Sequence, residues 1–404
     1  MTRGVLNLSL ENRLLLFCSQ TIISETRVVQ LNDLLSRSLN WEYITDSAFS
    51  WNVAQLLYHN LKDLGNRRLI PPEVMGKLKK AYHGNTARNM YLYAELRNIV
   101  NAFHNTGLDV IALKGAALAG IVYHDAGLRP MMDIDLLVRE EDVRSAQRIM
   151  TDLSYIAAGE GKSEQWYREK HFHLPRYRHQ QKPVVVEIHW HFTENTFGID
   201  IKKWWERARE VNLMGCRVLI LSPEDMLVHL CIHLYNHGYE NTFVLRGLCD
   251  ISEILRHYEA EIDWKLLGDE IIKKGIEKQV HSMLYLAREF YDLKERSLPL
   301  ISLDQVDHRF LKILQKSLFA DQGNGSINLH LLKSMVFDTF LQKARYLLPQ
   351  IFPSREEMAK RYPVSPSSKM IFFYYLLHPF HLMAKYGKSA VEILRTRAGK
   401  NGRK

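Results

Sequence analysis

The chain has 404 residues, more than one hydrophobic core usually organises, so we expect two or three packed units. Apolar residues make up 46% and charged residues 25% of the chain, a composition that excludes a disordered or fibrous protein. The net charge is +9, but the last twenty residues hold seven basic residues and one acidic residue and so supply +6 of it. The nearly neutral remainder does not favour nucleic acid as a partner, although a local basic groove stays open.

The cysteines and the apolar segments bear on the compartment. The chain has four cysteines, Cys18, Cys216, Cys231 and Cys249. No two of them are close in the sequence, so neither a disulfide framework nor a zinc ribbon is indicated, and a reducing cytoplasm fits best. We expect no signal peptide, because charged residues interrupt the apolar pattern of residues 1–16. We also expect no transmembrane segment, because the longest apolar stretch, residues 370–384, is shorter than the roughly twenty residues a spanning helix needs.

The hydrophobic period changes twice along the chain. Residues 12–103 carry apolar residues every three to four positions, as helices do. Residues 108–192 instead alternate between short strands and helices. The expected strands cover 108–113, 133–138 and 184–192, and the expected helices between them cover 116–123 and 140–153. Helical periodicity returns after residue 200 and persists to residue 394.

This order predicts an α+β protein, in which a small α/β core is flanked by helices on both sides in sequence. The predicted parts are an N-terminal helical region at 1–87, the core at 88–200, a larger C-terminal helical domain at 201–384 and a basic tail at 385–404. One helix start is well defined, because Ser222 suits the cap, Pro223 the first turn and Asp225 the acidic position of a capping box.

The segment 133–138, Asp-Ile-Asp-Leu-Leu-Val, carries the strongest chemical signal. Side chains alternate along a strand, so Asp133 and Asp135 share one face while their apolar neighbours point to a core. Two adjacent carboxylates repel each other unless a cation or a basic side chain lies between them. Hard oxygen ligands favour Mg²⁺ or Mn²⁺. The pattern indicates a divalent-metal site, with a solvated strand face as the alternative.

A second strand adds a third carboxylate. Residues 184–192 alternate between apolar side chains on one face and Glu187, His189 and His191 on the other. Three carboxylates on neighbouring strands can hold two cations, or hold one and deprotonate an attacking hydroxyl, as nucleotidyl transfer requires. The alternative is that Glu187 and the histidines solvate an edge face.

Two further positions are candidates for phosphate binding. Lys114 and Gly115 stand at a turn from a strand into a helix, where a glycine allows close approach and the free N–H groups attract an anion. Arg129 could bind phosphate through its guanidinium or neutralise Asp133. A tight turn with a surface lysine is the alternative for the Lys-Gly pair.

These residues together resemble a known family, the uncharacterised bacterial nucleotidyltransferases of the DNA polymerase beta-like superfamily. The resemblance is carried by Leu-Lys-Gly-Ala-Ala-Leu at 113–118, Tyr123, Arg129, the segment 133–138 and the Val-Glu-Ile-His strand at 186–189. It extends loosely from Ala54 to Asp250. It implies a nucleotidyltransferase core with a short mixed sheet, a divalent metal on Asp133 and Asp135, and Glu187 as the third carboxylate. The wider superfamily has a Gly-Ser pair where this chain has Lys114 and Gly115.

The predicted activity is transfer of a nucleoside monophosphate from an NTP such as ATP to an acceptor hydroxyl or phosphate of a small molecule, with release of pyrophosphate. The predicted catalytic and metal-binding residues are Asp133, Asp135 and Glu187, and the predicted nucleotide-binding residues are Lys114, Gly115 and Arg129. Two alternatives stay open. One is a catalytically silent nucleotide- or metal-binding module of the same fold, and the other is a toxin-like enzyme that modifies tRNA or a protein.

Two other segments carry potential chemistry. His229, His233 and His237 recur every four residues. We expect them to pack in the core or line a cleft, with metal ligands on one helix face as the alternative. Cys231 and Asp250 are further possible donors, and Asp250 is also the expected ion-pair partner of Arg246. The aromatic stretch 370–384 with its basic tail predicts either docking to an anionic membrane or RNA, or a core helix followed by a solvated tail.

Overall fold

The computed structural model describes the following residues: 8–158, 167, 172–192, 200–237, 244–291, 293, 306, 308, 311, 344, 347–349 and 351–398. Side chains of residues 237 and 385–398 lie outside this description. The chain divides into two compact units, one of residues 1–235 and 242–306, and one of residues 236–241 and 307–404. Each unit is described by itself.

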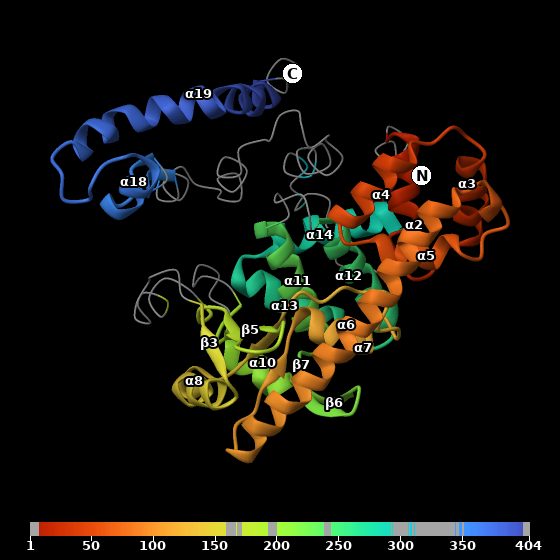
Figure 1. The fold of residues 1–404 in the computed structure, drawn as a ribbon, viewed down its shortest axis with the longest axis horizontal. Helices are drawn as coiled ribbons and strands as arrows, with labels where there is room; N and C mark the ends of the chain where they lie inside the picture. Colours follow the sequence, from red (N-terminus) through yellow and green to blue (C-terminus); the bar gives the residue numbers. More distant parts are fainter. Residues whose placement is uncertain are drawn as a thin grey trace. The chain divides into compact units, whose positions relative to one another are not determined.

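The first unit is built on one mixed sheet with the strand order β3-β4-β5-β2-β1-β7-β6. Figure 1 labels four of these strands, β3, β5, β6 and β7. Its strands are β1 (Ile111–Ala112), β2 (Ile134–Leu137), β3 (Tyr155–Ala157), β4 (Tyr177–His179), β5 (Val185–His189), β6 (Arg209–Leu213) and β7 (Cys216–Ile220). The pairs β2–β5 and β1–β7 are parallel, and the other pairs are antiparallel. The predicted α+β class with a mixed sheet is confirmed.

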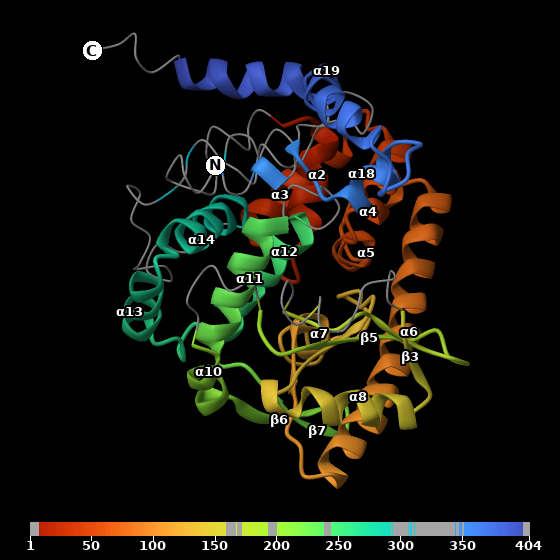
Figure 2. The ribbon, with the colours of Figure 1, turned by 90° about the vertical axis from the view of Figure 1, so that its left-hand side faces the viewer.

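Helices surround this sheet on both sides in sequence. They are α2 (Leu10–Cys18), α3 (Glu25–Leu35), α4 (Trp41–Ser50), α5 (Ala54–Leu61), α6 (Pro72–Asn105), α7 (Lys114–Ile121), α8 (Val143–Asp152), α10 (Ile201–Arg207), α11 (Pro223–His237), α12 (Val244–His257), α13 (Trp264–Lys274) and α14 (Glu277–Tyr291). Helix α6 packs against α4 and α5 near one end and against α8 and β7 farther along, so it links the N-terminal helices to the sheet (Figure 2).

The sheet extends beyond the predicted core. Strands β6 and β7 lie in a segment for which we predicted helices, and that prediction was wrong. They form a hairpin whose turn, Met214 and Gly215, takes positive φ angles of 49° and 84°, as tight hairpin turns require. The predicted boundary at residue 200 therefore falls between β5 and β6 of one sheet, and the boundary at residue 87 falls inside α6.

The start of helix α11 has the predicted capping arrangement. The hydroxyl oxygen of Ser222 accepts a hydrogen bond from the Asp225 backbone N–H at 3.3 Å, and the hydroxyl donates to the Asp225 carboxylate at 3.1 Å. Pro223 is the first helical residue. This prediction is confirmed, because capping depends on neighbours in sequence rather than on the tertiary fold.

The described part of the second unit contains α18 (Arg355–Arg361) and α19 (Ile371–Ala398), which pack against each other. The prediction of a core helix at 370–384 was wrong for several of its large apolar side chains, which are exposed. Among the described residues, α18 and the segment after it contact only part of the surface of α19. Among the described helices, none is long and apolar enough to cross a membrane.

Candidate active site

The loop between α7 and β2 is fixed by polar side chains of α6. The Asn89 side-chain amide donates to the backbone carbonyls of Ala126 and Arg129, both at 2.7 Å, and Asn85 donates to the carbonyl of Gly127 at 2.9 Å. Both asparagines are buried. A buried backbone carbonyl needs such a partner, so α6 determines where the chain enters β2.

Strand β2 places Asp135 at the centre of the site. Its carboxylate is buried, with 3% of the residue exposed. The oxygen Oδ1 accepts hydrogen bonds from Lys114 Nζ at 3.1 Å and from His189 Nε2 at 3.0 Å. Burial alone would raise the pKa of Asp135, but the Lys114 and His189 charges outweigh it and hold that pKa well below its usual range.

Glu187 stands directly beside Asp135, because the parallel strands β2 and β5 pair these two residues in register. Arg176 Nε donates to Glu187 Oε1 at 2.6 Å, and His189 Nε2 lies 3.4 Å from Glu187 Oε2. Burial opposes ionisation of Glu187, but His189 and Lys114 lower its pKa to about 2. The structure therefore brings together the carboxylates that the sequence placed on two different strands.

His189 bridges the two carboxylates. Burial lowers its pKa, but the hydrogen bonds to Asp135 and Glu187 outweigh that effect and raise it overall. Among the described residues, the ligand atoms of Asp135, Glu187 and His189 form the group in which all lie within 4.8 Å of one another. The sequence placed His189 on the same strand face as Glu187, but we gave it no role in the site. The alternative of a solvated edge face is wrong for both residues, because β5 is buried from Val186 onwards.

Asp133 lies beside this group but outside it, just before the first residue of β2. Its side chain is half-buried. Burial, followed by the charges of Asp135 and Glu187, raises the pKa of Asp133 to about 6, although Lys114 and Arg176 oppose the rise. A carboxyl group with this pKa exchanges its proton near neutral pH.

Lys114 is the first residue of α7 and has a left-handed backbone, with φ at 44°. A non-glycine residue in this conformation is uncommon and costs free energy. In this backbone conformation, Lys114 Nζ contacts the Asp135 carboxylate. Burial lowers the pKa of Lys114, but Asp135 and Glu187 raise it overall, so the side chain is a permanent cation.

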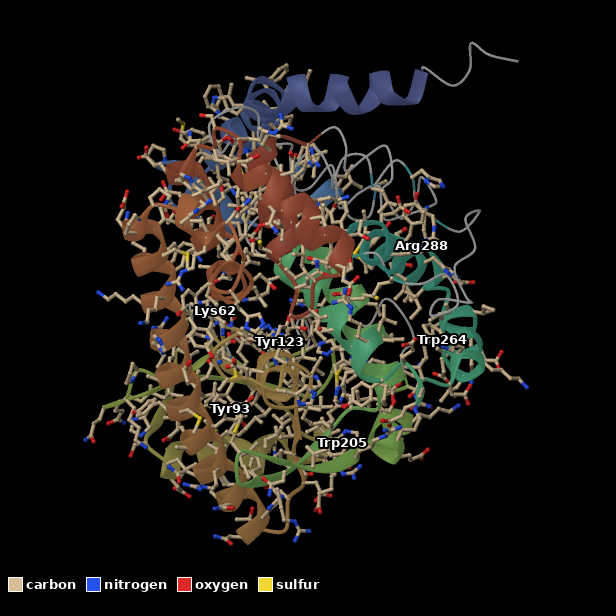
Figure 3. All side chains as sticks on the ribbon, turned by 90° about the vertical axis from the view of Figure 1, so that its right-hand side faces the viewer. Lys62, Tyr93, Tyr123, Trp205, Trp264 and Arg288 are labelled. Carbon is tan, nitrogen blue, oxygen red and sulfur yellow. The ribbon has the colours of Figure 1, made fainter. Side chains whose placement is uncertain are left out.

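The second predicted phosphate ligand, Arg129, is instead bound by Asp250 of α12. Its Nε and Nη2 each donate to one oxygen of that carboxylate at 2.8 Å, and Arg129 is 5% exposed. The hydroxyl of Tyr123, a residue labelled in Figure 3, donates to the same carboxylate at 2.7 Å. Arg129 therefore ties the loop before β2 to α12, and its predicted contacts with phosphate or with Asp133 give way to this ion pair.

Gly115 provides the space that Arg129 occupies. A Cβ atom at this position would lie 2.7 Å from Arg129 Nη1 and 3.2 Å from Met131 Cγ. We expect Gly115→Ala to lower the free energy of unfolding by about 1–3 kcal/mol through overpacking. Urea unfolding measures the change. Gly84→Ala is the control, because a Cβ at Gly84 meets nothing within 4 Å. Equal stability of the two variants would contradict this role.

Among the described residues, the histidines of α11 do not form a metal group, which was the alternative for them. His229 is buried, and its ring centre lies 6.3 Å from that of His233. Burial, Lys114 and His189 lower the pKa of His229 to about 3, so it is a neutral residue close to the site. The side chain of His237 lies outside the described residues.

Two other residues were predicted to take part in this region, Cys231 and Arg246. Cys231 is buried and free, as are the other three cysteines. Arg246, the expected partner of Asp250, is close enough for that charge to raise its pKa, but burial and Arg129 lower it to about 10 overall.

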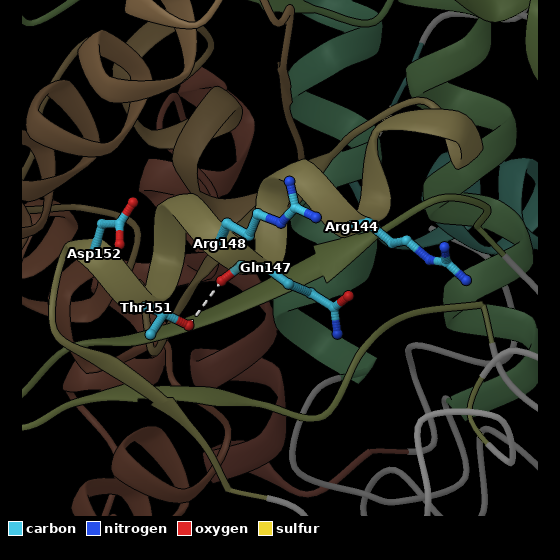
Figure 4. A pocket seen from close by; sticks show the side chains of 5 residues that line it. All are labelled: Arg144, Gln147, Arg148, Thr151 and Asp152. Carbon is cyan, nitrogen blue, oxygen red and sulfur yellow. Dashed lines mark hydrogen bonds between the residues drawn. The ribbon is translucent and has the colours of Figure 1, made fainter.

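A separate open pocket lies on α8 (Figure 4). It is lined by Arg144, Gln147, Arg148, Thr151 and Asp152. The lining belongs to a single helix and includes none of the strand carboxylates, so this pocket is distinct from the acidic group.

A comparison with known protein families identifies the family of this chain. A family model described as an uncharacterised nucleotidyltransferase matches residues 37–292, more than half of the chain. The chain belongs to this family. The matched region contains the whole sheet, Lys114 and the acidic group, and it confirms the family resemblance of the sequence. None of the curated proteins compared with the chain matches it.

Proposed function

We propose that this family member is a metal-dependent nucleotidyltransferase that moves a nucleoside monophosphate from an NTP to a hydroxyl or phosphate of a small acceptor, with release of pyrophosphate. The observation that carries the proposal is the in-register pair Asp135 and Glu187, with Lys114 at the adjacent helix start. The four free, buried cysteines suit a reducing cytoplasm, in which we place the enzyme.

The donor set fits a divalent cation. Two buried carboxylates lie side by side, and in the structure Lys114 and His189 supply the positive charge that such a pair needs. Asp135 and Glu187 would hold Mg²⁺ or Mn²⁺, and the imidazole nitrogen of His189 makes Mn²⁺ the better match. When bound, such a cation neutralises phosphate oxygens and orients the triphosphate.

The side chains of the chain have separate tasks in this proposal. The ammonium group of Lys114 stabilises the charge that develops on the phosphate oxygens, and the N-terminus of α7 presents N–H groups to them. The acceptor oxygen attacks the α-phosphorus, the bond from that phosphorus to the bridging oxygen breaks, and pyrophosphate leaves. Both oxygens of Glu187 face Arg176 or His189, so we assign the acceptor proton to Asp133.

One observation favours a second candidate, a silent binding module of the same fold. Lys114 and His189 already neutralise Asp135 within the chain, so no cation is needed to balance its charge. A silent module would bind a nucleotide or a metal ion without catalysing a reaction.

Pyrophosphate release tests the proposal. The full chain is incubated with each of the four NTPs and a panel of small hydroxyl and phosphate acceptors, with Mn²⁺, with Mg²⁺, or with a chelator. We expect release with at least one NTP, and loss of it with the chelator. Thermal unfolding in parallel measures binding, because a ligand present at 100 times its Kd stabilises the folded state by about 2.7 kcal/mol. Metal-dependent stabilisation without turnover would favour the silent module, and the absence of both effects would refute nucleotide binding.

A further inference from the structure

Helix α19 exposes a row of large apolar side chains. Their exposed fractions are 56% for Phe372, 54% for Phe373, 71% for Leu376, 68% for Phe380 and 69% for Met383. At the helical spacing of about 100° per residue, these five positions fall within an arc of about 100°. We call these five residues the apolar stripe. A contiguous exposed patch of this kind marks a surface that binds something apolar.

The opposite face of α19 is already used within its own unit. Ile371 and His378 on that face are buried, with 0% and 4% exposed. The Tyr362 ring stacks on Tyr374 with 4.8 Å between centres, and the Tyr362 hydroxyl lies 2.8 Å from His378 Nδ1. These contacts attach α19 to the segment that follows α18. Of the apolar stripe, Phe372 also contacts α18, because the Arg355 guanidinium lies 5.1 Å from the centre of its ring. Each of the five stripe residues is nevertheless more than half exposed.

The charge of the helix and its tail identifies the partner surface. Helix α19 continues to Ala398, and residues 385–404 contain seven basic residues and one acidic residue. The helical spacing continues the line of the stripe through small or apolar residues at positions 387, 390, 391 and 394. An apolar row on a helix rich in basic residues is the pattern of a helix that lies in the interface of an anionic membrane.

We propose that the apolar stripe of α19 and the basic residues after it bind an anionic lipid surface, with the helix lying along the membrane rather than crossing it. None of the described helices is suited to crossing, which fits an interfacial position. Phenylalanine, leucine and methionine gain free energy by leaving water for the acyl boundary. RNA would bind the basic residues but would leave Leu376 and Met383 without an apolar partner, so lipid is the better match.

Vesicle sedimentation of the full chain tests this proposal. The vesicles contain either phosphatidylcholine alone or phosphatidylcholine with phosphatidylglycerol. We expect binding to the anionic vesicles to be at least about tenfold stronger, because each basic residue near the surface adds about 1 kcal/mol. The double variant Leu376→Asp/Phe380→Asp should reduce binding at least about tenfold. The control is Ile272→Asp on α13, an apolar side chain with 65% exposure, which should change binding less than about twofold.

Thermal unfolding establishes that both variants are folded, which their exposed positions favour. Equal binding of the double variant and the control would overturn the proposal. Equal binding of the original chain to the two kinds of vesicle would also overturn it. The same holds if the original chain does not bind vesicles and the double variant instead loses self-association or RNA binding. The proposal does not depend on nucleotidyl transfer, so it survives if no NTP is consumed.

Discussion

Replacing Asp135 with asparagine is expected to lower the rate of nucleotidyl transfer by about three orders of magnitude, which corresponds to about 4 kcal/mol of transition-state stabilisation. The amide keeps the shape of the side chain but loses the charge that would hold a cation and that now binds Lys114 and His189. Pyrophosphate release under single-turnover conditions measures the rate. Glu187→Gln should have a similar effect, because its carboxylate lies in register with Asp135.

The matched control is Asp152→Asn, which removes an exposed carboxylate of α8 from the pocket of Figure 4. Its rate should equal that of the original chain. Thermal unfolding of each variant separates a loss of catalysis from a loss of folded protein. An Asp135→Asn variant that is folded and as active as the control would remove the carboxylate pair from the mechanism.

Arg129→Met is expected to lower the free energy of unfolding by about 3–5 kcal/mol, because it leaves the Asp250 carboxylate buried without its cation. The pair is made by two hydrogen bonds of 2.8 Å, and 5% of the Arg129 side chain and 3% of the Asp250 side chain are exposed. Urea unfolding measures the cost. The double variant Arg129→Met/Asp250→Leu should recover part of it, because no isolated charge then stays buried.

The control for this experiment is Arg37→Met, which breaks the exposed ion pair with Asp33 on α3. Exposed pairs contribute less than about 1 kcal/mol, so this change should be small. If Arg129→Met costs no more than Arg37→Met, the link between the loop before β2 and α12 is not important for stability.

The sequence predicted the strands of the site but not how they pair. Alternation along residues 184–192 placed Glu187 and His189 on one face. Alternation cannot show that this face is buried against β2, which depends on packing between distant segments. His189 was therefore given no role in the site, whereas it bridges Asp135 and Glu187. The metal and catalytic roles of these residues stay predictions.

The contacts of Arg129 could not be predicted from the sequence either. Its position four residues before Asp133 suggested a local charge partner or a phosphate. The structure pairs it with Asp250, 121 residues away in sequence. No local pattern encodes such a contact. The capping of α11 by Ser222 was predictable because both partners are within three residues of each other, and hairpin β6–β7 could have been found from the glycine at its turn.

Crystals grown with Mn²⁺ and a non-hydrolysable NTP would test the central claim most directly. The anomalous scattering of manganese locates the ion independently of the nucleotide. We predict an anomalous peak within coordination distance of the Asp135 and Glu187 carboxylates, with triphosphate oxygens on its other side and Lys114 Nζ turned towards them. A nucleotide bound elsewhere, or bound at this site with Lys114 and His189 still holding Asp135 and no manganese peak, would contradict the account.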